Sequence, residues 1–437
     1  MERITIIGAG LAGSEAALQL ADRGVKVTLV DCKPLVMSPA HHNTDFAEVV
    51  CSNSFKSKEI ASASGLFKAE LKALGCKLLQ FAEENSVGAG GALAVDRQKF
   101  SAAVTEALKL NPNITIENRY ADDVEADGIT VVATGPLTMP LLADKIKEKC
   151  GEFCYFFDAA APIVSAESID AENAFCDDRY QKGEGDYINC PMNKEEFELF
   201  WKELTTAKTA EVKDFENDSV FEGCMPIEVM AKRGQDTIRF GPLKPVGLID
   251  PKTGRRPYAV VQLRKENAGG DMYNLVGFQT HLTFGEQKRV FSLIPALKNA
   301  EFVKYGVMHR NIYVDSPKVL NDDFSLKVNP DVFFAGQIVG VEGYVESIAS
   351  GLIVAINILR RQKNLTKLDL GDNTIIGNLM RYVVTSNDDF QPMNANFGLV
   401  PPLSVLIRDK KAKKQALADR SLEEINILAR QILQEVE

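Results

Sequence analysis

The hydrophobic pattern near the start of the chain places an amphipathic stretch between two short apolar runs. Residues 4–7 (ITII) and 25–30 (VKVTLV) have the apolar, β-branched character of short buried strands. Residues 14–24 (SEAALQLADRG) place alanine and leucine side chains on one face of a helix that stops at Gly24. This order predicts a strand, a helix and a strand in succession, as in a Rossmann-type fold.

Two later stretches also change from an apolar strand to a glycine turn. Residues 127–138 (DGITVVATGPLT) run from a strand into a turn at Gly135. Residues 329–359 contain the strand VFFAG, a glycine-rich loop and then a helix with an apolar inward face. Each stretch therefore predicts a point at which the backbone passes close to a cofactor.

The middle of the chain, residues 151–305, follows a different pattern. A strand-like segment leads into an amphipathic helix that carries Trp201, and extended segments punctuated by glycine and proline come after it. We therefore expect an α/β protein in which a mixed α/β insertion (151–305) divides a Rossmann-like domain. Its first part would be 1–150, and its second part, 306–437, would end in a C-terminal helix.

Composition and charge narrow the classes of function. The 437 residues are 45% hydrophobic and 25% charged, and the net charge of −10 argues against a general nucleic-acid binder. Local basic faces remain possible at 408–414, 360–363 and Arg255–Arg256. Eight scattered cysteines without CxxC pairs, and only four histidines, predict no bound metal. The sequence shows no secretory signal and no membrane-spanning run, so a cytoplasmic protein is expected.

A glycine motif joins the first predicted strand to the first helix: Gly8, Gly10 and Gly13 have G-x-G-x-x-G spacing. The first glycine allows a tight turn, the second lets the backbone approach a pyrophosphate, and the third lets the helix pack closely on the strand. Asp31 ends the second strand and is placed to accept a ribose hydroxyl. The second glycine loop suits a flavin enzyme better than an NAD dehydrogenase, so FAD is the favoured ligand. The expected cofactor-binding residues are Gly8, Ala9, Gly10, Leu11, Ala12, Gly13, Asp31, Gly135, Gly336, Glu342, Gly343 and Tyr344.

Several longer motifs carry a family resemblance. They are IIGAGLAGSEAA, EVVCSNSFKS, GGALAVDRQKFS, FEGCMPIEVMA, FGPLKPVGL, FFAGQIVGVEGYVES and FQPMNANFGLVPP, and they span nearly the whole chain. With them the chain resembles the folate- and FAD-dependent tRNA (uracil-5-)-methyltransferases, relatives of the larger wobble-uridine modification flavoproteins. The segments VCSNS, EGCMPIE and PMNANFGL are more specific than the glycine loops. The resemblance implies a Rossmann-like FAD-binding domain of the glutathione-reductase type.

The resemblance also implies a reaction: methylation of the T-loop uridine of tRNA at carbon 5. Methylenetetrahydrofolate would supply the carbon, and FAD reduced by NADPH or NADH would supply the electrons. Carbon 5 of uracil becomes nucleophilic when a thiolate adds to carbon 6, which is covalent catalysis. The hypothesis is that Cys224 is this nucleophile. Cys51 would lie beside the flavin, where it traps or shields the reactive methylene or exchanges roles with Cys224.

Other residues near these motifs are candidates for supporting roles. Glu342 and Glu346 could orient the flavin or carry protons, and Tyr344 could stack on a ring or pack in the core. His41 and His42 could act as a base or hold a phosphate. The turn that presents Cys51 is expected to be shaped by Asn53 and Ser54. The first choices for contact with the tRNA backbone are Arg255, Arg256, Arg264 and Lys265.

Three alternatives remain open at this point. The same chemistry could act on a uridine of ribosomal RNA, because the motifs report the reaction and not the RNA surface. The chain could instead be a small-molecule flavin oxidoreductase in which Cys51 and Cys224 are structural or redox-active. It could also be a noncatalytic, FAD-stabilised tRNA-binding scaffold. No DNA or membrane partner is expected under any of these interpretations.

Overall fold

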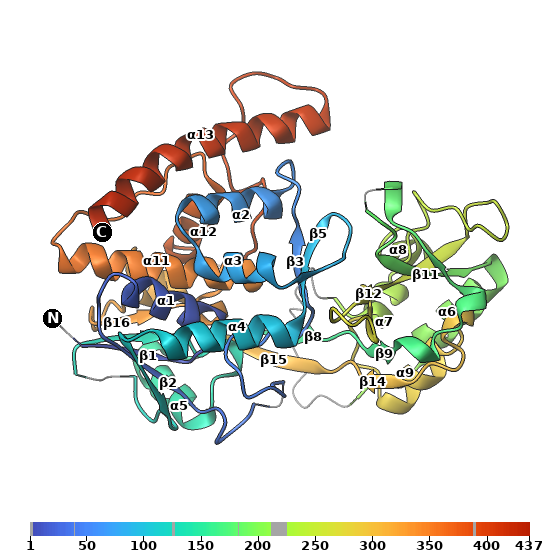
Figure 1. Cartoon of the computed structure of the whole chain (residues 1–437), viewed down its shortest axis with the longest axis horizontal. Coiled ribbons are helices and arrows are strands. Elements are labelled where there is room, and N and C mark those ends of the chain that lie inside the picture. Colours follow the sequence, from blue (N-terminus) through green and yellow to red (C-terminus); the bar gives the residue numbers. More distant parts are fainter. Residues whose placement is uncertain (1–2, 39, 125–126, 182, 211–224, 388–389) are drawn as a thin grey trace.

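The structure is a computed structural model that describes residues 3–38, 40–124, 127–181, 183–210, 225–387 and 390–437. Figure 1 shows two lobes side by side, one built from the first and last thirds of the chain and one from its middle. The first lobe contains a five-stranded parallel sheet in the order β16-β7-β1-β2-β6. Its strands are β1 (Ile4–Ile7), β2 (Val27–Asp31), β6 (Ile114–Asn118), β7 (Ile129–Val132) and β16 (Val332–Phe334).

The apolar strands of this sheet are buried on both faces. Ile4 of β1 lies opposite Val27 of β2 on one side and Ile129 of β7 on the other. All four residues of β1 and of β7 are buried, as expected for central strands of a parallel sheet covered by helices. The predicted Rossmann-like α/β fold is confirmed.

Helices and a small sheet surround the parallel sheet. The helices are α1 (Leu11–Ala21), α2 (Ala63–Ala73), α3 (Lys77–Glu84), α4 (Arg97–Leu110), α5 (Pro140–Cys150), α10 (Ser316–Val319), α11 (Tyr344–Gln362), α12 (Ile375–Val384) and α13 (Lys410–Val436). The small sheet has the order β3-β5-β4, with β3 (Ser54–Ser57), β4 (Ser86–Val87) and β5 (Ala92–Val95). Helices α1 and α11 pack closely, because a Cβ at Gly351 would lie 2.1 Å from the carbonyl oxygen of Ala12.

Helix α1 begins earlier than the apolar pattern predicts. It starts at Leu11 and not near Ser14, and the backbone N–H of Ser14 donates to the carbonyl of Gly10 at 2.9 Å to close the first turn. The helix ends at Ala21, and Gly24 follows with a φ of +79°. The second half of the glycine motif is therefore helical, which periodicity alone cannot reveal because glycine and alanine give little hydrophobic contrast.

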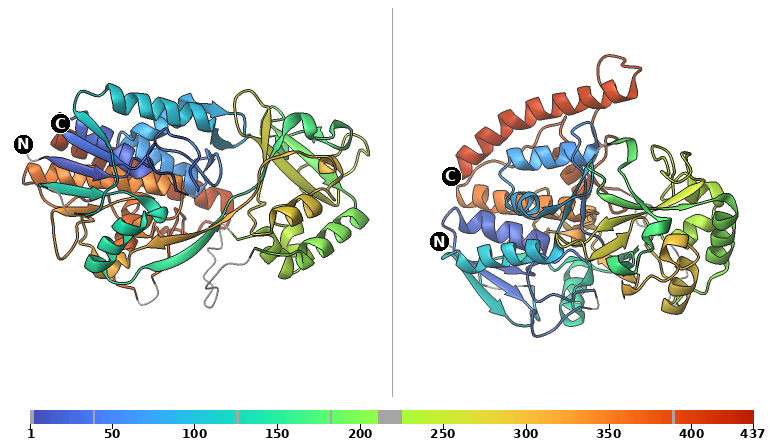
Figure 2. Two further views of the ribbon diagram at one scale, coloured as in Figure 1. Left: turned by 90° about the horizontal axis from the view of Figure 1, so that it is seen from below. Right: turned by 45° about the vertical axis from the view of Figure 1, so that its right-hand side comes forward.

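The second lobe is a six-stranded sheet with helices packed against it. The sheet order is β10-β11-β12-β13-β9-β14, and its strands are β9 (Ile163–Ser165), β10 (Phe175–Cys176), β11 (Tyr187–Met192), β12 (Ala259–Lys265), β13 (Met272–Leu275) and β14 (Phe302–Lys304). Its helices are α6 (Lys194–Thr206), α7 (Ile227–Lys232), α8 (Gln235–Arg239) and α9 (Phe284–Phe291). An antiparallel ribbon of β8 (Cys154–Ala159) and β15 (Met308–Tyr313) joins the lobes (Figure 2). No described helix is long and apolar enough to cross a bilayer.

Candidate functional site

A cleft opens at the carboxyl ends of the parallel strands in the first lobe. Its empty volume is about 1200 Å³, including the space open to solvent. The wall is formed by the turns that follow β1, β2, β6 and β7 and by the loop between β16 and α11. This edge of an open α/β sheet is where such folds bind ligands.

Two pairs of glycines show what the cleft accommodates. A Cβ at Gly13 would lie 1.9 Å from the carbonyl oxygen of Gly8, and one at Gly8, where φ is +102°, would lie 2.6 Å from that of Ala133. These two glycines are required by the protein's own packing. Gly10 and Gly135 line the cleft, yet a Cβ on either would meet no protein atom within 4 Å. Their missing side chains leave room for a ligand at the N-terminus of α1, as a dinucleotide pyrophosphate requires.

Asp31 holds the turn that follows β1. Its carboxylate accepts hydrogen bonds from the backbone N–H groups of Ala9 at 2.6 Å and Lys33 at 2.8 Å. The Lys33 ammonium group forms an ion pair with Glu48 at 3.1 Å, and both side chains are largely buried. The Asp31 carboxylate is thus fixed at the cleft and keeps further lone pairs for a ribose hydroxyl. The residues present fit a dinucleotide cofactor.

His41 lines the same cleft and is held neutral. Burial, followed by the positive charge of Lys33, lowers the pKa of His41 to about 4. The Nδ1 atom lies 2.6 Å from the hydroxyl of Ser38. At neutral pH this imidazole can exchange hydrogen bonds with a ligand, but it offers no charge to a phosphate. His42 is exposed and does not line the cleft.

Tyr344 joins the cleft to Cys51. The Tyr344 hydroxyl accepts hydrogen bonds from the backbone N–H groups of Cys51 at 2.8 Å and Ser52 at 3.1 Å, and it lies 2.9 Å from the Cys51 sulfur. Burial, followed by the Cys51 charge, raises the pKa of Tyr344 well above its ordinary value, so the hydroxyl keeps its proton. Because two N–H donors occupy both acceptor positions, that proton is directed to the sulfur.

The start of α11 fixes the position of Tyr344. Gly343 precedes the helix with a φ of +122°, and a Cβ there would lie 2.2 Å from Oε2 of Glu346. The buried Glu346 accepts a hydrogen bond from the backbone N–H of Ala395 at 3.0 Å. Glu342 accepts one at 2.9 Å from the Gln337 side chain, which lines the cleft. Gly343, Glu342 and Glu346 therefore support the cleft and are not among its lining residues.

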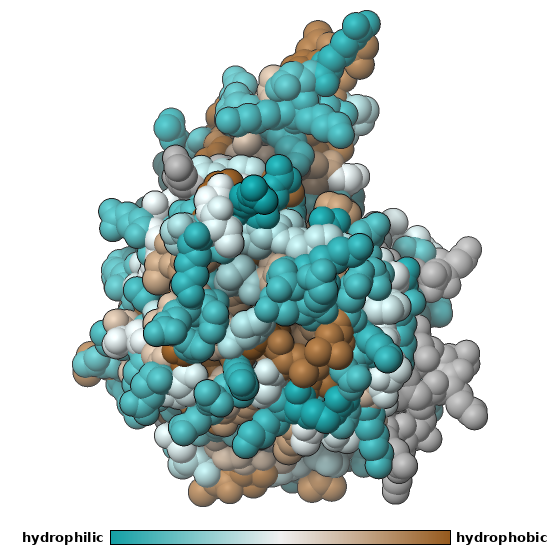
Figure 3. All heavy atoms as spheres, turned by 90° about the vertical axis from the view of Figure 1, so that its right-hand side faces the viewer, coloured by the Kyte–Doolittle hydropathy of each residue, from teal (hydrophilic) through white to brown (hydrophobic). Residues whose placement is uncertain are grey.

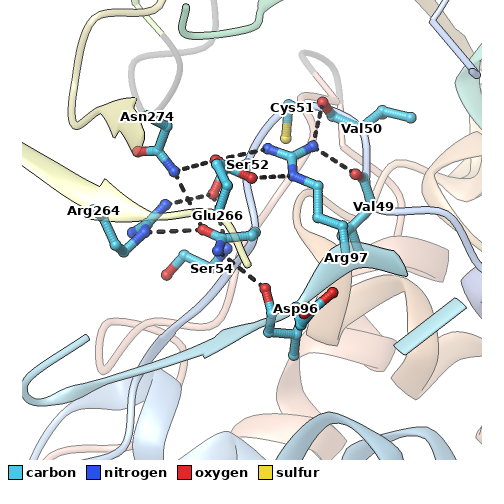
Figure 4. Close-up of polar contacts among 12 residues, drawn as sticks. Val49, Val50, Cys51, Ser52, Ser54, Asp96, Arg97, Arg264, Glu266 and Asn274 are labelled. Carbon is cyan, nitrogen blue, oxygen red and sulfur yellow. Dashed lines mark hydrogen bonds and ion pairs between the residues drawn. The ribbon is translucent and has the colours of Figure 1, made fainter. Parts of the chain in front are cut away.

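Arg97 holds the segment that leads into Cys51. Its guanidinium donates to the backbone carbonyls of Val49 at 2.7 Å and Val50 at 2.9 Å, and to the Glu266 carboxylate at 2.5 Å (Figure 4). Burial opposes its charge, but the ion pair with Glu266 outweighs this effect, so the pKa of Arg97 lies above its ordinary value. Because Glu266 follows β12, the contact ties the cysteine segment of the first lobe to the second lobe.

The second lobe also forms hydrogen bonds with the next two residues, Ser52 and Asn53. Arg264 donates to Asn53 at 2.9 Å and to the Ser52 hydroxyl at 3.2 Å. Asn53 donates to the backbone carbonyl of Lys265 at 2.8 Å, and its expected role in shaping the turn agrees with these bonds. The expectation that Arg264 contacts RNA is wrong, because its side chain is buried and engaged with the cysteine turn. Arg255 and Arg256 are exposed.

A lysine of the second lobe adds charge near Cys51. Burial, followed by the charge of Arg97, lowers the pKa of Lys304, while the carboxylates of Glu48 and Glu266 and the Cys51 sulfur act in the opposite direction.

Sequence reasoning missed Arg97, Glu266 and Lys304. Arg97 lies within the motif GGALAVDRQKFS, but no local pattern indicates its distant partner.

The structure gathers most of the predicted cofactor residues in one place. Those that line the cleft are Gly8, Ala9, Gly10, Leu11, Ala12, Asp31, Gly135, Gly336 and Tyr344. Gly13, Glu342 and Gly343 lie behind it. Cys224 lies outside the described residues. Within the described ranges, no group of histidine, cysteine and carboxylate side chains could hold a metal ion. The arrangement combines a dinucleotide cleft with Cys51, which lies against the hydroxyl of the cleft-lining Tyr344.

Comparison with known proteins places the chain in a family. It matches the family described as Glucose inhibited division protein A over residues 3–366. The "Methylenetetrahydrofolate--tRNA-(uracil-5-)-methyltransferase TrmFO" of Desulfitobacterium hafniense is 55% identical over 424 residues, covering 97% of each chain. The protein of the same name from Bacillus velezensis is 51% identical over 433 residues, covering 99% of each. The structure of Aquifex aeolicus GidA aligns with a TM-score of 0.70 at 17% identity, covering 100% of this chain and 74% of that one, which shows a shared fold. The chain therefore belongs to the methylenetetrahydrofolate–tRNA-(uracil-5-)-methyltransferase family.

Proposed function

We propose that this protein methylates carbon 5 of the T-loop uridine in tRNA, with methylenetetrahydrofolate as the carbon donor. FAD, when bound, supplies the two electrons that turn the transferred methylene into a methyl group, and NADPH or NADH replaces them. The observation that carries the proposal is identity of 51–55% over 97–99% of the chain to relatives named for this reaction. Because tRNA is a cytoplasmic substrate in bacteria, the proposed location is the cytoplasm.

The residues of the cleft supply binding and orientation. Gly10 and Gly135 leave space for the FAD pyrophosphate, and Asp31 accepts a ribose hydroxyl. Tyr344, which lines the cleft, holds the Cys51 sulfur at 2.9 Å from its hydroxyl. Cys51 can there shield the reactive carbon or exchange roles with Cys224. These assignments rest on geometry and on the family chemistry together.

Cys224 is proposed as the nucleophile. Its thiolate adds to carbon 6 of uracil, forming a carbon–sulfur bond and placing the electron pair in an enolate. Carbon 5 then attacks the electrophilic methylene. Carbon 5 loses its proton to a base, and the bond between the methylene and its carrier breaks, with the electron pair leaving on the carrier. Reduction of the remaining methylene by the two electrons named above, with a proton, gives the methyl group, and expulsion of the thiolate restores the ring. The target base must leave its stack for carbon 6 to be reached.

A covalent-trapping experiment tests these roles. The enzyme is incubated with tRNA that contains 5-fluorouracil, whose carbon 5 has no proton to lose. We expect the wild type and Cys51→Ala to form a covalent protein–RNA complex, and Cys224→Ala to form none. A complex that persists in Cys224→Ala would assign the nucleophile elsewhere.

A methylation assay tests the reaction itself against its alternatives. Purified protein, NADPH and methylenetetrahydrofolate are combined with unmodified tRNA or with ribosomal RNA fragments, and nucleosides are analysed by mass spectrometry. We expect 5-methyluridine in tRNA only when the folate donor is present. Product in the ribosomal fragments alone would redirect the proposal, and NADPH oxidation without methylation of either RNA would favour a small-molecule oxidoreductase.

A further inference from the structure

Helix α13 begins as an arm that carries concentrated positive charge. The cluster consists of Arg408, Lys410, Lys411, Lys413 and Lys414, and we call residues 408–414 the basic arm. All of these side chains are exposed, and the helix is buried against the body only from Leu417 onward. The amino-terminal end of α13 and the loop before it extend beyond α2 in Figure 1 and form the protrusion at the top of Figure 3.

The charge of the arm is not neutralised by the protein. Within the described part of the chain, none of the five cations of the arm forms an ion pair. The basic run 360–363 differs, since Arg360 pairs with Glu435 and Arg361 pairs with Asp331. Asp409 lies within the arm, but its carboxylate caps α13 through the backbone N–H of Ala412 at 2.7 Å.

The position of the arm on the helix strengthens its field. The first turn of α13 contains no acidic residue, so the lysine charges add to the positive end of the helix dipole. Cations at this end oppose helix formation, and a bound anion relieves the repulsion. Because the whole protein carries a net charge of −10, the arm is a local basic region on a protein whose overall charge repels nucleic acid.

The arm suits a polyanion better than a membrane surface. Residues 410–415 (KKAKKQ) contain no large apolar side chain, whereas a helix that lies on a bilayer needs an apolar face. Val405 and Leu406 are exposed, but they belong to the loop before the helix. Lysines on an exposed helical turn can contact phosphates of an RNA backbone, and such contacts read no sequence.

We infer that the basic arm binds the phosphate backbone of tRNA outside the T-loop that reacts. The arm contributes no residue to the cleft or to the surroundings of Cys51, so its contact is separate from the site of methylation. The inference rests on the proposed tRNA substrate and adds a second contact to it. The arm raises the affinity for whole tRNA and leaves the chemistry unchanged.

The test neutralises the arm without disturbing the helix. In the arm variant, Lys410, Lys411, Lys413 and Lys414 are replaced by glutamine, which has a similar helix propensity. Its net charge becomes −10 − 4 = −14. The control variant has the same net charge through glutamine at four dispersed, exposed lysines: Lys99, Lys109, Lys202 and Lys298. Each protein is assayed for FAD content, for NADPH-driven flavin reduction without RNA, and for KM with full-length tRNA and with a T-arm hairpin.

We expect the arm variant to show a KM for full-length tRNA raised by ~10-fold, with its kcat, FAD content and flavin reduction unchanged. The dependence of tRNA binding on salt should become shallower by up to about 3 in the logarithmic slope, as four lost phosphate contacts predict. The hairpin KM should change little in either variant. An unchanged KM for full-length tRNA, or an equal rise in the control variant, overturns the inference.

Two further outcomes distinguish a membrane contact from a failure of the proposed function. Binding of the wild type, but not of the arm variant, to anionic phospholipid vesicles, together with an unchanged tRNA KM, would overturn the inference in favour of a membrane contact. A wild-type protein that methylates neither RNA would refute the proposed function itself. If the wild type methylates tRNA and the arm variant has the same KM for full-length tRNA, the inference about the arm alone is refuted.

Discussion

Gly10 and Gly13 stand three residues apart in one motif, yet the structure gives them different tasks. Gly13 is required because a side chain there would overlap the protein's own backbone. Gly10 meets no protein atom, and its missing side chain leaves space in the cleft. A Gly10→Val protein should therefore fold with a stability loss of about 1 kcal/mol or less, because its extended backbone accepts valine, but its FAD content should fall sharply. A Gly13→Ala protein should lose about 1–3 kcal/mol, because its Cβ overlaps the Gly8 carbonyl.

Flavin absorbance of the purified proteins and thermal unfolding of the FAD-free forms measure this difference. Gly10→Val should lower the flavin absorbance and change the unfolding temperature little, whereas Gly13→Ala should lower both. Full flavin content in Gly10→Val would contradict the assignment of the cleft near the start of α1 to the cofactor.

The Tyr344 hydroxyl directs its proton to the Cys51 sulfur. Removing it in Tyr344→Phe should make the thiolate of Cys51 less favourable and move its pH–rate profile for alkylation by iodoacetamide upward by about one pH unit. Peptide mass spectrometry after timed alkylation at several pH values gives this profile. The exposed Cys176 is an internal control and should react alike in both proteins. Identical Cys51 profiles would show that the hydroxyl only supports the backbone.

At the scale of elements, two buried glutamates cap neighbouring helices. Glu15 of α1 accepts hydrogen bonds from the first N–H groups of α3, at 3.0 Å from Lys77 and 2.8 Å from Leu78. Glu70 of α2 does the same for α12, at 2.9 Å from Ile375 and 2.7 Å from Ile376. Burial raises the pKa of both carboxyl groups, to about 7 for Glu70.

The raised pKa of Glu70 gives a pH dependence with a definite sign. Between pH 4.5 and 7 the unfolded chain releases the proton while the folded protein keeps it, so stability falls as pH rises through this window. The total loss is about 3 kcal/mol. In Glu70→Gln the side chain stays neutral and this loss is absent. Thermal unfolding from pH 5 to 8 should therefore show the melting temperature of the wild type falling relative to that of the variant. A constant difference over this range would mean that Glu70 is ionised throughout.

Element prediction succeeds where burial leaves a strong local signal. The strands at the start of the chain and after residues 127 and 329 are apolar because both faces of the sheet are covered, and the structure contains all of them. The apolar pattern places the start of α1 too late, because Gly10, Ala12 and Gly13 carry almost no hydrophobic contrast. The glutamate caps have no local signal at all, since each serves a helix elsewhere in the chain.

At the scale of the whole molecule, the Arg97–Glu266 pair links the lobes at the cysteine segment. Glu266→Gln removes one charge and leaves Arg97 mostly buried without its partner, which should cost about 3 kcal/mol of unfolding free energy. Methylation kcat should fall, because Arg97 also holds the carbonyls before Cys51. FAD content should remain, since neither residue lines the cleft.

An ion pair nearer the surface supplies the control. Glu286 pairs with Arg289 at 2.7 Å on the surface of α9, and Glu286→Gln should cost less than about 1 kcal/mol with no effect on kcat. Urea unfolding and steady-state methylation measure both variants. Equal effects of the two substitutions would show that the link between the lobes has no special role.

The sequence by itself determined the strand–helix–strand unit, the glycine motif, Asp31 and the family chemistry, because each depends on residues close together in the chain. Only the tertiary structure decided how Cys51 is held. Tyr344 is 293 residues from Cys51, and Glu266 is 169 residues from Arg97. Such bonds depend on how distant elements pack, and the sequence around a polar side chain does not indicate the partner that folding brings to it. The structure also showed that Arg360 and Arg361 form ion pairs, whereas among the described residues the cations of the basic arm form none. Ion pairing depends on which side chains folding brings together, and the order of residues does not reveal it.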